Sequence, residues 1–336
     1  MPEIVGAEMR FQMIESHGGG PLSTLKTQST EVGVESGQVV CAVDADGRRH
    51  LLIPAAWDEG FQPDRGSAGV HVTQRRLVDS AGRDRAFIDI ECRRSSLSRL
   101  FSSVVDEVLS ALSAAGGETP SGTCQQVLER WRELLGPGRS ELLSKERLLG
   151  LMAELLLLRR IACRSPAAAL NSWRGWESDR FDFETTGLAA EVKASSAREG
   201  RSVTIHGVTQ LEPPEGATLY LNFVRLEPTQ QAGGTSVPDL VRALIQSGVN
   251  SAELFRRLGL VGYRASDEEA YRTRFNATEC SLFRVDDSFP RIVRSSFVGG
   301  RLPERVATVR YRVDLADYPI EPEPALDELV EAMAPR

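Results

Sequence analysis

Hydrophobic and polar positions alternate in short runs along the first ninety or so residues, as they do in strands with one buried face. The clearest runs lie at residues 37–43, 48–53, 69–78 and 85–92. The first two flank Asp46-Gly47 and the last two flank Ser80-Ala81-Gly82, and both sequences favour tight turns. The acidic run from Asp44 resembles the start of a calcium loop, but no glutamate stands at the last position of such a loop. The pattern therefore predicts an N-terminal sheet built from hairpins.

Two amphipathic helices are predicted after this sheet. Apolar residues recur every three or four positions from Leu97 to Leu112, and again from Cys124 to Leu135. Gly116-Gly117 ends the first pattern, and Gly136-Pro137-Gly138 ends the second. The second group of helix-breaking residues is the best candidate for a domain boundary, which we place near residue 139.

The pattern beyond this boundary is typical of an α/β domain. A helix is predicted from residue 140 to about residue 163. Strands are expected at residues 181–185, 189–194, 202–206 and 217–226. A short helical piece is expected at 207–211 and a helix at 238–246. This order predicts helices packed around one small mixed sheet.

The remaining residues begin helical and then turn to strand, with strands predicted at 280–285, 292–297 and 306–313. Residues 317–331 carry six carboxylates and no basic residue, which is typical of a solvated terminal helix or tail. We therefore expect three parts. They are an N-terminal β-rich domain with two covering helices (1–139), a core (140–250) and a C-terminal α+β extension (251–336).

Composition narrows the class of protein. The chain has 336 residues, of which 41% are hydrophobic, so it can form real cores and is not mainly disordered. No apolar run reaches the roughly eighteen residues that span a bilayer, and residues 1–10 lack the pattern of a secretion signal. The five cysteines form no CxxC pair and show no metal-binding spacing with His17, His50 or His71. We expect a soluble cytoplasmic protein with no membrane association, no disulfide framework and no zinc cage.

The charged residues add a second constraint. The chain carries 40 basic and 47 acidic residues, so its net charge of −7 repels polyanions. Only Lys26, Lys145 and Lys193 are lysines, and the other 37 basic residues are arginine. A lysine at a chemically interesting position is therefore informative, and Lys193 is at such a position.

Candidate chemistry gathers on two of the predicted strands. Asp182 lies in the first, and Glu191 and Lys193 lie in the next, across a turn at Gly187. Alternation puts Glu191 and Lys193 on one face and Val192 on the other. If the strands form a hairpin, Asp182 comes to lie opposite them, so two carboxylates and one ammonium converge. Such a set suits Mg²⁺ and a scissile phosphate. The alternative is an ordinary ion pair on an exposed strand.

The residues around this set resemble the signature of the PD-(D/E)xK nuclease superfamily, which has the restriction-endonuclease-like fold. The resemblance rests on Phe181-Asp182-Phe183, on Ala190-Glu191-Val192-Lys193-Ala194-Ser195 and on the apolar helix around Glu154. It spans residues 140–248, and Phe181 stands where the proline of the signature would be. The combination looks like the branch described only as PD-(D/E)xK motif proteins, which are thought to belong to prokaryotic restriction-type defence systems.

The resemblance implies a fold, an activity and a site. The fold is α/β, with a restriction-endonuclease-like core in which helices flank a mixed sheet. The activity is Mg²⁺-dependent endonuclease cleavage of DNA, with Mn²⁺ as a substitute, in a restriction or anti-phage defence system with partner proteins. Asp182, Glu191 and Glu154 would hold the metal, and Lys193 and Gln210 would complete the catalytic set. A homodimer is also consistent with the resemblance, because many relatives pair to cut both strands.

Several of these residues have a second interpretation. Glu154 lies in a helix that is apolar on nearly all sides, so it needs a partner, and that partner could be Arg147 or Arg160 instead of a metal. Gln210 could be an ordinary helix-start amide. His206, at the end of a predicted strand, could carry a proton or be structural.

Contact with DNA would need basic side chains near the site. Arg180, Arg198 and Arg201 flank it and are expected to contact phosphates, or else to be solvated loop charges. Residues 141–250 contain 12 basic and 13 acidic side chains, a net charge near −1. Weak binding to free DNA is therefore expected, with partner proteins or a specific DNA structure bringing the substrate. The alternative function is a catalytically silent scaffold or nucleic-acid-binding module of the same fold.

Overall fold

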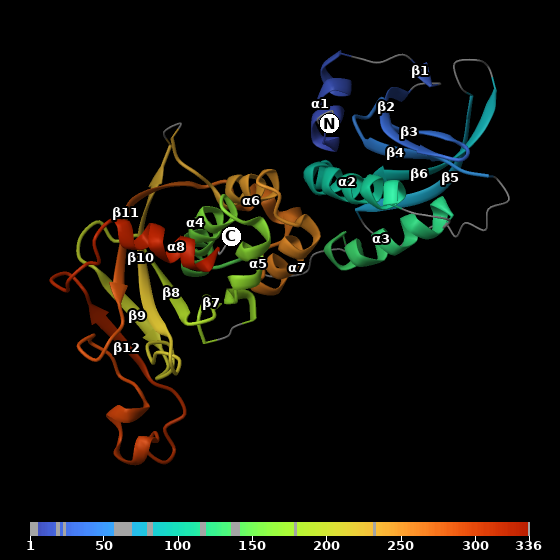
Figure 1. The fold of residues 1–336 in the computed structure, drawn as a ribbon. Coiled ribbons are helices and arrows are strands. Elements are labelled where there is room, and N and C mark those ends of the chain that lie inside the picture. Colours follow the sequence, from blue (N-terminus) through green and yellow to red (C-terminus); the bar gives the residue numbers. More distant parts are fainter. Residues whose placement is uncertain are drawn as a thin grey trace. The chain divides into compact units, whose positions relative to one another are not determined.

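The chain divides into two compact units, which Figure 1 shows in a computed structural model. The structure describes residues 6–17, 21–22, 25–56, 69–78, 83–114, 119–135, 142–177, 180–230 and 233–334. Unit 1 comprises residues 1–140 with the short segment 264–267, and unit 2 comprises residues 141–263 and 268–336. Each unit is described separately below.

Unit 1 is an antiparallel sheet with three helices described beside it. Its elements are α1 (Ala7–His17), β1 (Pro21–Leu22), β2 (Leu25–Val34), β3 (Gly37–Val43), β4 (Arg49–Pro54), β5 (Val70–Val78), β6 (Asp84–Cys92), α2 (Ser98–Ala114) and α3 (Pro120–Leu135). The strand order is β1-β2-β3-β4-β6-β5, with every neighbouring pair antiparallel. Helices α1 and α2 contact the sheet, and α3 packs against α2 (Figure 1).

The hairpin expected at Asp46-Gly47 joins β3 to β4. The Asp44 N–H donates to the Arg48 carbonyl at 3.0 Å, and the Gly47 N–H donates to the Asp44 carbonyl at 3.1 Å. Gly47 has a φ of +76°, a conformation that glycine adopts without strain. The expected Ser80-Ala81-Gly82 turn lies outside the described residues, as do the glycine-rich segments at 116–117 and 136–138.

Unit 2 is a mixed α/β arrangement. Its elements are α4 (Lys145–Ala162), α5 (Pro166–Ser172), β7 (Phe183–Thr185), β8 (Leu188–Ser195), β9 (Ser202–His206), β10 (Thr218–Thr229), α6 (Val237–Gln246), α7 (Ser251–Val261), β11 (Arg274–Arg284), β12 (Arg310–Asp314) and α8 (Pro324–Met333). One sheet has the order β11-β10-β8-β7, in which only β8 and β10 are parallel. A second sheet pairs β12 with β9 in antiparallel register.

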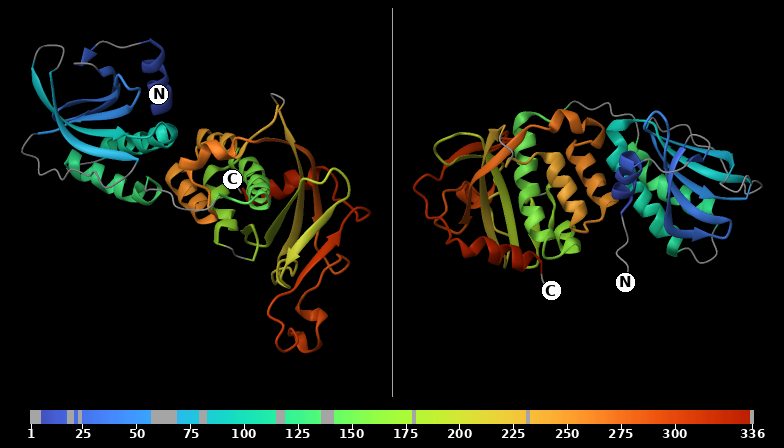
Figure 2. Two further views of the ribbon diagram at one scale, coloured as in Figure 1. Left: turned by 180° about the vertical axis from the view of Figure 1, so that it is seen from behind. Right: turned by 90° about the horizontal axis from the view of Figure 1, so that it is seen from above.

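The two sheets of unit 2 share a buried core. The core residues are Phe181, Ala189, Val203, Ile205, Leu211, Leu219, Leu221, Phe223, Phe283, Val285, Phe289, Val313 and Leu315. Helix α4 contacts β8 and β10 on the other face of the larger sheet, with α5, α6 and α8 packed against it (Figure 2). This mixed α/β architecture is compatible with a nuclease-like fold. None of the described helices is both long enough and apolar enough to cross a membrane.

The C-terminal residues are part of this unit and do not start a new one at residue 251. Strand β11 pairs with β10 from Tyr220↔Arg284 to Thr229↔Arg274, and β12 pairs with β9. The boundary expected at residue 250 therefore falls inside one continuous sheet, and the sequence pattern could not show this because strand pairing is not local.

Two local predictions in this unit are wrong. Residues 292–297 form no strand, because the Val293 N–H donates to Ser296 Oγ and the Ile292 N–H donates to the Tyr311 hydroxyl. Residues 207–211 form turns and bends and no helix, since Gly207 has a φ of +99°. The predicted strand at 306–313 is shortened to β12.

Phe283→Ala should lower the free energy of unfolding by about 3–5 kcal/mol, because it leaves a cavity where β11 enters the core. Phe283 is 0% exposed, whereas Val298 is fully exposed. Val298→Ala is therefore the control and should change stability by less than about 0.5 kcal/mol. Urea denaturation followed by tryptophan fluorescence measures both values. A loss under about 1 kcal/mol for Phe283→Ala would mean that β11 does not contribute to the core.

Candidate active site

Strand β8 carries the glutamate and the lysine of the candidate site. Glu191 and Lys193 share a face with Ala189, whose side chain is part of the buried core. The Lys193 Nζ lies 2.6 Å from Glu191 Oε1, and the two side chains are 16% and 2% exposed. The pair is therefore not the exposed surface ion pair that the sequence left open. It lies where the core ends, with the lysine still partly open to solvent.

Asp182 lies immediately before β7 and not within a strand, which corrects the sequence prediction. Its carbonyl accepts the N–H groups of Arg174 and Gly175 at 2.7 and 3.1 Å, so the chain turns away from β8 at this residue. Its side-chain Oδ2 accepts the Val192 N–H at 2.7 Å. The last β7–β8 pair is Phe183↔Ala190, so Asp182 lies one step further along, beside Glu191. The side chain of Asp182 therefore accepts a backbone N–H of β8 at the position where the β7–β8 backbone pairing ends.

Glu154 comes to the same site from helix α4. Its Oε2 accepts the indole N–H of Trp173 at 2.8 Å. The alternative partners do not contact it among the described residues, and Arg160 pairs with Asp327 at 3.2 Å. The chain passes close to this carboxylate at Gly175, where a Cβ would lie 3.1 Å from the Trp173 Nε1 and even closer to the Glu154 carboxylate.

The electrostatics show that these groups form one site. Burial raises the pKa of Glu191 to about 8; the Asp182 charge adds to this shift and Lys193 opposes it. Burial also raises the pKa of Asp182, with Lys193 opposing, and raises that of Glu154, with Asp182 adding. Burial alone would lower the pKa of Lys193, but the Glu191 and Asp182 charges outweigh it and the pKa is raised.

Gln210 links the lysine to the end of β9. Its Oε1 accepts the His206 N–H at 2.8 Å and lies 3.4 Å from the Lys193 Nζ. It therefore lies beside the site, in a turn and not at a helix start. His206 is exposed, and its pKa is lowered by partial burial and by the charges of Arg310 and Lys193.

Two of the three arginines expected to contact phosphates donate within the protein. Arg180 donates to the carbonyls of Thr209, at 2.8 Å, and Glu212. Arg201 pairs with Glu279 and donates to the Ala316 carbonyl at 3.0 Å. Both guanidinium groups therefore hold loops together, and their contact with phosphates stays a prediction.

Arg198 is exposed and has no hydrogen bond or ion pair with any residue that the structure describes. Its loop is held by Arg225, which donates to the carbonyls of Ala197 and, at 2.8 Å, Gly200. Arg225 also pairs with Glu279 at 2.8 Å. The loop that carries Arg198 is therefore fixed to β10 and β11.

Sequence reasoning missed Trp173 and Arg310. Trp173 donates its indole N–H to Glu154. The only hint of this contact in the sequence is the tryptophan itself, because an indole N–H needs an acceptor when it is buried. Arg310 lies on β12 directly opposite His206, and its positive charge, like that of Lys193, lowers the pKa of that imidazole. No sequence signal connected Arg310 with the site, because the β9–β12 pairing joins distant segments.

The site suits a divalent cation. Three carboxylates, from Glu154, Asp182 and Glu191, lie around one ammonium, and two of them are partly exposed and so can be reached from solvent. Their oxygens do not all lie within 4.8 Å of one another, so side-chain movement would have to close the set around an ion. Oxygen ligands are those that Mg²⁺ and Mn²⁺ prefer. Without a cation, burying this excess negative charge is costly.

Comparison with known proteins gives one match. The family model described as "Putative PD-(D/E)XK family member, (DUF4420)" matches residues 13–316. No curated protein and no solved structure matches the chain. Proteins of the PD-(D/E)XK superfamily are mostly nucleases and typically use divalent metals.

Gly175→Ala should destabilise the protein by about 1–3 kcal/mol, because the added methyl group overlaps the Glu154 carboxylate and pushes it from Trp173. Gly150→Ala is the matched control. Gly150 lies within α4 and a Cβ there has no atom within 4 Å, so the change should stabilise the helix by up to about 1 kcal/mol. Urea denaturation measures both. Equal effects of the two substitutions would contradict the close contact at Gly175.

Metal-free protein should become less stable as the pH rises. The folded-state pKa of Glu191 is raised from 4.5 to about 8, so protonation contributes stability that is complete below pH 4.5 and is lost as the pH rises through 8. In EDTA, the melting temperature should fall from about pH 5.5 to about pH 8.5, and Glu191→Gln should flatten this slope. Glu199→Gln, at an exposed position, should keep the wild-type slope. An unchanged slope in Glu191→Gln would refute the shift.

Proposed function

The chain belongs to the PD-(D/E)XK family that this model describes, and we propose that it is a Mg²⁺-dependent nuclease that hydrolyses DNA phosphodiester bonds. The observation that carries the proposal is the convergence of Glu154, Asp182 and Glu191 on the single ammonium of Lys193. A scaffold without activity would have no need of so costly a group of buried charges, so the enzyme is favoured over the silent scaffold.

Each of these residues has a distinct role in the proposal. Asp182 and Glu191 would hold the metal ion, and Glu154, oriented by Trp173, would complete the set from α4. Such an ion, when bound, would supply Lewis-acid polarisation of the phosphate and a more acidic water. The Asp182 side chain is kept in place by the Val192 N–H, so its ligand oxygens are positioned before the ion arrives.

Lys193 acts on the phosphate and on the attacking water. Its raised pKa keeps it protonated at neutral pH, so its role is to orient the water and to stabilise negative charge as it develops on the phosphate. Gln210 positions this ammonium from the end of β9. The ammonium is paired with Glu191 at 2.6 Å, so the same lysine that would act on the phosphate also balances one of the carboxylates that would hold the metal.

Exposed basic groups near the site suit the DNA backbone. Arg198 lies on the fixed loop after β8, and Arg310 lies on β12 beside His206. Against these, the whole chain carries a net charge of −7, so its affinity for free duplex should be low. We infer that a partner protein brings the DNA, as in a prokaryotic restriction or anti-phage defence system in the cytoplasm.

Glu191→Gln and Lys193→Met should each slow cleavage of plasmid DNA at least about 100-fold, because each removes a charge that acts on the transition state. The assay uses the full chain with Mg²⁺ or Mn²⁺ and follows conversion of supercoiled plasmid. Glu199→Gln and Lys145→Met make the same chemical changes at exposed positions and should cleave at the wild-type rate. Cleavage by all five proteins at one rate would remove the assigned site. No cleavage by the wild type with either ion would favour the silent scaffold.

A further inference from the structure

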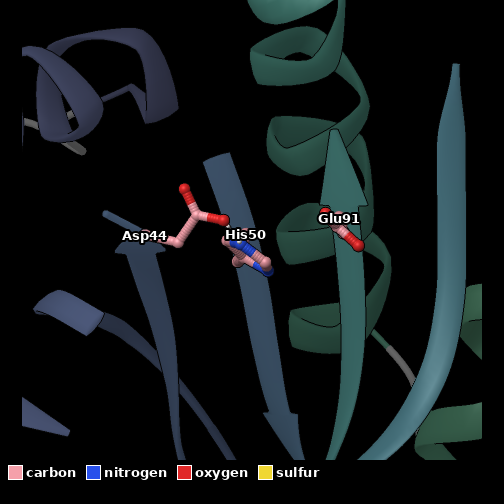
Figure 3. A group of neighbouring side chains, drawn as sticks. All are labelled: Asp44, His50 and Glu91. Atoms are coloured by element: carbon pink, nitrogen blue, oxygen red, sulfur yellow. Dashed lines mark ion pairs between the residues drawn. The ribbon is translucent and has the colours of Figure 1, made fainter. Parts of the chain in front are cut away.

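Three side chains of unit 1 form a second cluster of metal-binding groups. Asp44 follows β3, His50 lies in β4 and Glu91 lies in β6, and His50 and Glu91 are direct register partners. One ligand atom from each residue lies within 4.8 Å of the others. Figure 3 shows the imidazole of His50 between the two carboxylates. Because neighbouring strands supply the residues, a rigid sheet holds the cluster.

The imidazole of His50 has one nitrogen without a hydrogen-bond partner. The side chain is 2% exposed, and its Nδ1 lies 2.8 Å from Asp89 Oδ1, so Nδ1 carries the proton and donates it to that carboxylate. Nε2 is buried and has no hydrogen-bond partner among the described residues. It lies 3.5 Å from Asp44 Oδ2. In neutral imidazole this nitrogen presents a lone pair, so a lone pair and an anionic oxygen face each other across a gap that either a proton on Nε2 or a metal ion would fill.

Asp44 and Glu91 each have one carboxylate oxygen that the hydrogen bonds described below do not use. Asp44 Oδ1 accepts the N–H groups of Asp46 and Arg48 at 2.9 and 2.8 Å, which leaves Oδ2 toward His50. Glu91 Oε1 lies 2.7 Å from Arg93 and 3.4 Å from Arg48, and neither contact uses Oε2. Arg48 also lies 3.9 Å from Asp44 Oδ2, so Arg93 and Arg48 are the cations that compete with a metal ion for these two carboxylates.

We propose that Asp44 Oδ2, His50 Nε2 and a Glu91 carboxylate oxygen bind a divalent transition-metal ion of the zinc class. An imidazole nitrogen selects such ions over Mg²⁺ or Ca²⁺. Two ligand atoms on one tetrahedral zinc ion lie about 3.3 Å apart, close to the separation of the Asp44 and His50 atoms. Two carboxylates and a neutral imidazole also balance the charge of the ion.

Asp89 orients the His50 ring in this proposed site by accepting its Nδ1–H. A metal-bound histidine usually donates its other N–H to a carboxylate, which fixes the ring and makes the ligand nitrogen more basic. Asp89 is itself balanced by Arg75 at 3.1 Å. The ion would tie the turn after β3 to strands β4 and β6, so its role is to stabilise this part of the sheet.

The test is a Zn²⁺ titration of the EDTA-treated full chain in a Glu191→Gln background, which removes the candidate nuclease site from the measurement. Isothermal calorimetry gives affinity and stoichiometry, and Co²⁺ absorption reports nitrogen and oxygen coordination. We expect one Zn²⁺ per chain, a rise in melting temperature and no such response to Mg²⁺. Absence of Zn²⁺ binding would overturn the proposal, because a proton on His50 would then fill the gap.

Two matched variants locate the ion. Asp44→Asn keeps an oxygen for the turn but removes the charge facing His50, and should weaken Zn²⁺ binding at least about 100-fold. Asp46→Asn changes the next acid of the same turn, whose side chain is 68% exposed, and should bind as tightly as the parent. Asp89→Asn should weaken binding about 10–100-fold through His50. Equal affinity in Asp44→Asn and Asp46→Asn would place the ion elsewhere. Circular dichroism of each variant shows that the fold is kept.

Discussion

Burial of three carboxylates beside one ammonium is the constraint on which unit 2 depends. Charged groups in a low-dielectric interior are costly unless they are paired, and among the residues that the structure describes Glu191 has only Lys193 as an opposite charge within contact. The protein holds the excess negative charge with directed hydrogen bonds, from the Val192 N–H to Asp182 and from the Trp173 indole to Glu154. These bonds fix the oxygens but do not neutralise them. The site is therefore prepared for a cation that completes it.

The apolar core determines where this charge can lie. Ala189 is part of the core on the same face of β8 as Glu191 and Lys193, so the strand passes from an apolar environment to a polar one within a few residues. Strands β9 and β12 close one side of that core, and β11 closes the edge of the sheet. The segments after residue 250 are thus needed for the site, since the core that supports β8 includes side chains from both β11 and β12.

Sequence patterns predicted the strands and helices that local hydrophobic periodicity determines. Strands β3, β5, β6 and β9 and helices α2 and α6 lie within a few residues of their expected positions, because alternation and helical spacing are written into adjacent residues. The geometry of Glu191 and Lys193 followed from alternation alone. The position of Asp182 outside β7 did not, because two backbone N–H groups from residues 174 and 175 draw it out of the strand.

Contacts between distant segments were beyond the sequence pattern. Three features depend on tertiary packing. They are the contact of Trp173 with Glu154, the β9–β12 pairing, and the internal hydrogen bonds and ion pairs of Arg180 and Arg201. The cluster around His50 is a further example. The spacing of Asp44, His50 and Glu91 follows no metal-binding motif, yet strand register brings the last two directly opposite each other. Spacing rules apply to ligands on one loop or helix, and they fail when neighbouring strands share the site.

The two candidate sites differ in how firmly they would keep an ion. In unit 2 the Lys193 ammonium lies 2.6 Å from Glu191 Oε1, so it would compete with a metal ion for that carboxylate. In unit 1 the proposed ligand nitrogen of His50 is oriented by Asp89, and the competing guanidinium groups lie at the carboxylates, with Arg93 2.7 Å from Glu91 Oε1 and Arg48 3.9 Å from Asp44 Oδ2. The proposed ion in unit 1 would thus have one ligand, the His50 nitrogen, that no ammonium or guanidinium contacts among the described residues, and we expect it to be held more firmly than an ion in unit 2. That difference suits a structural role for the first site and a catalytic role for the second.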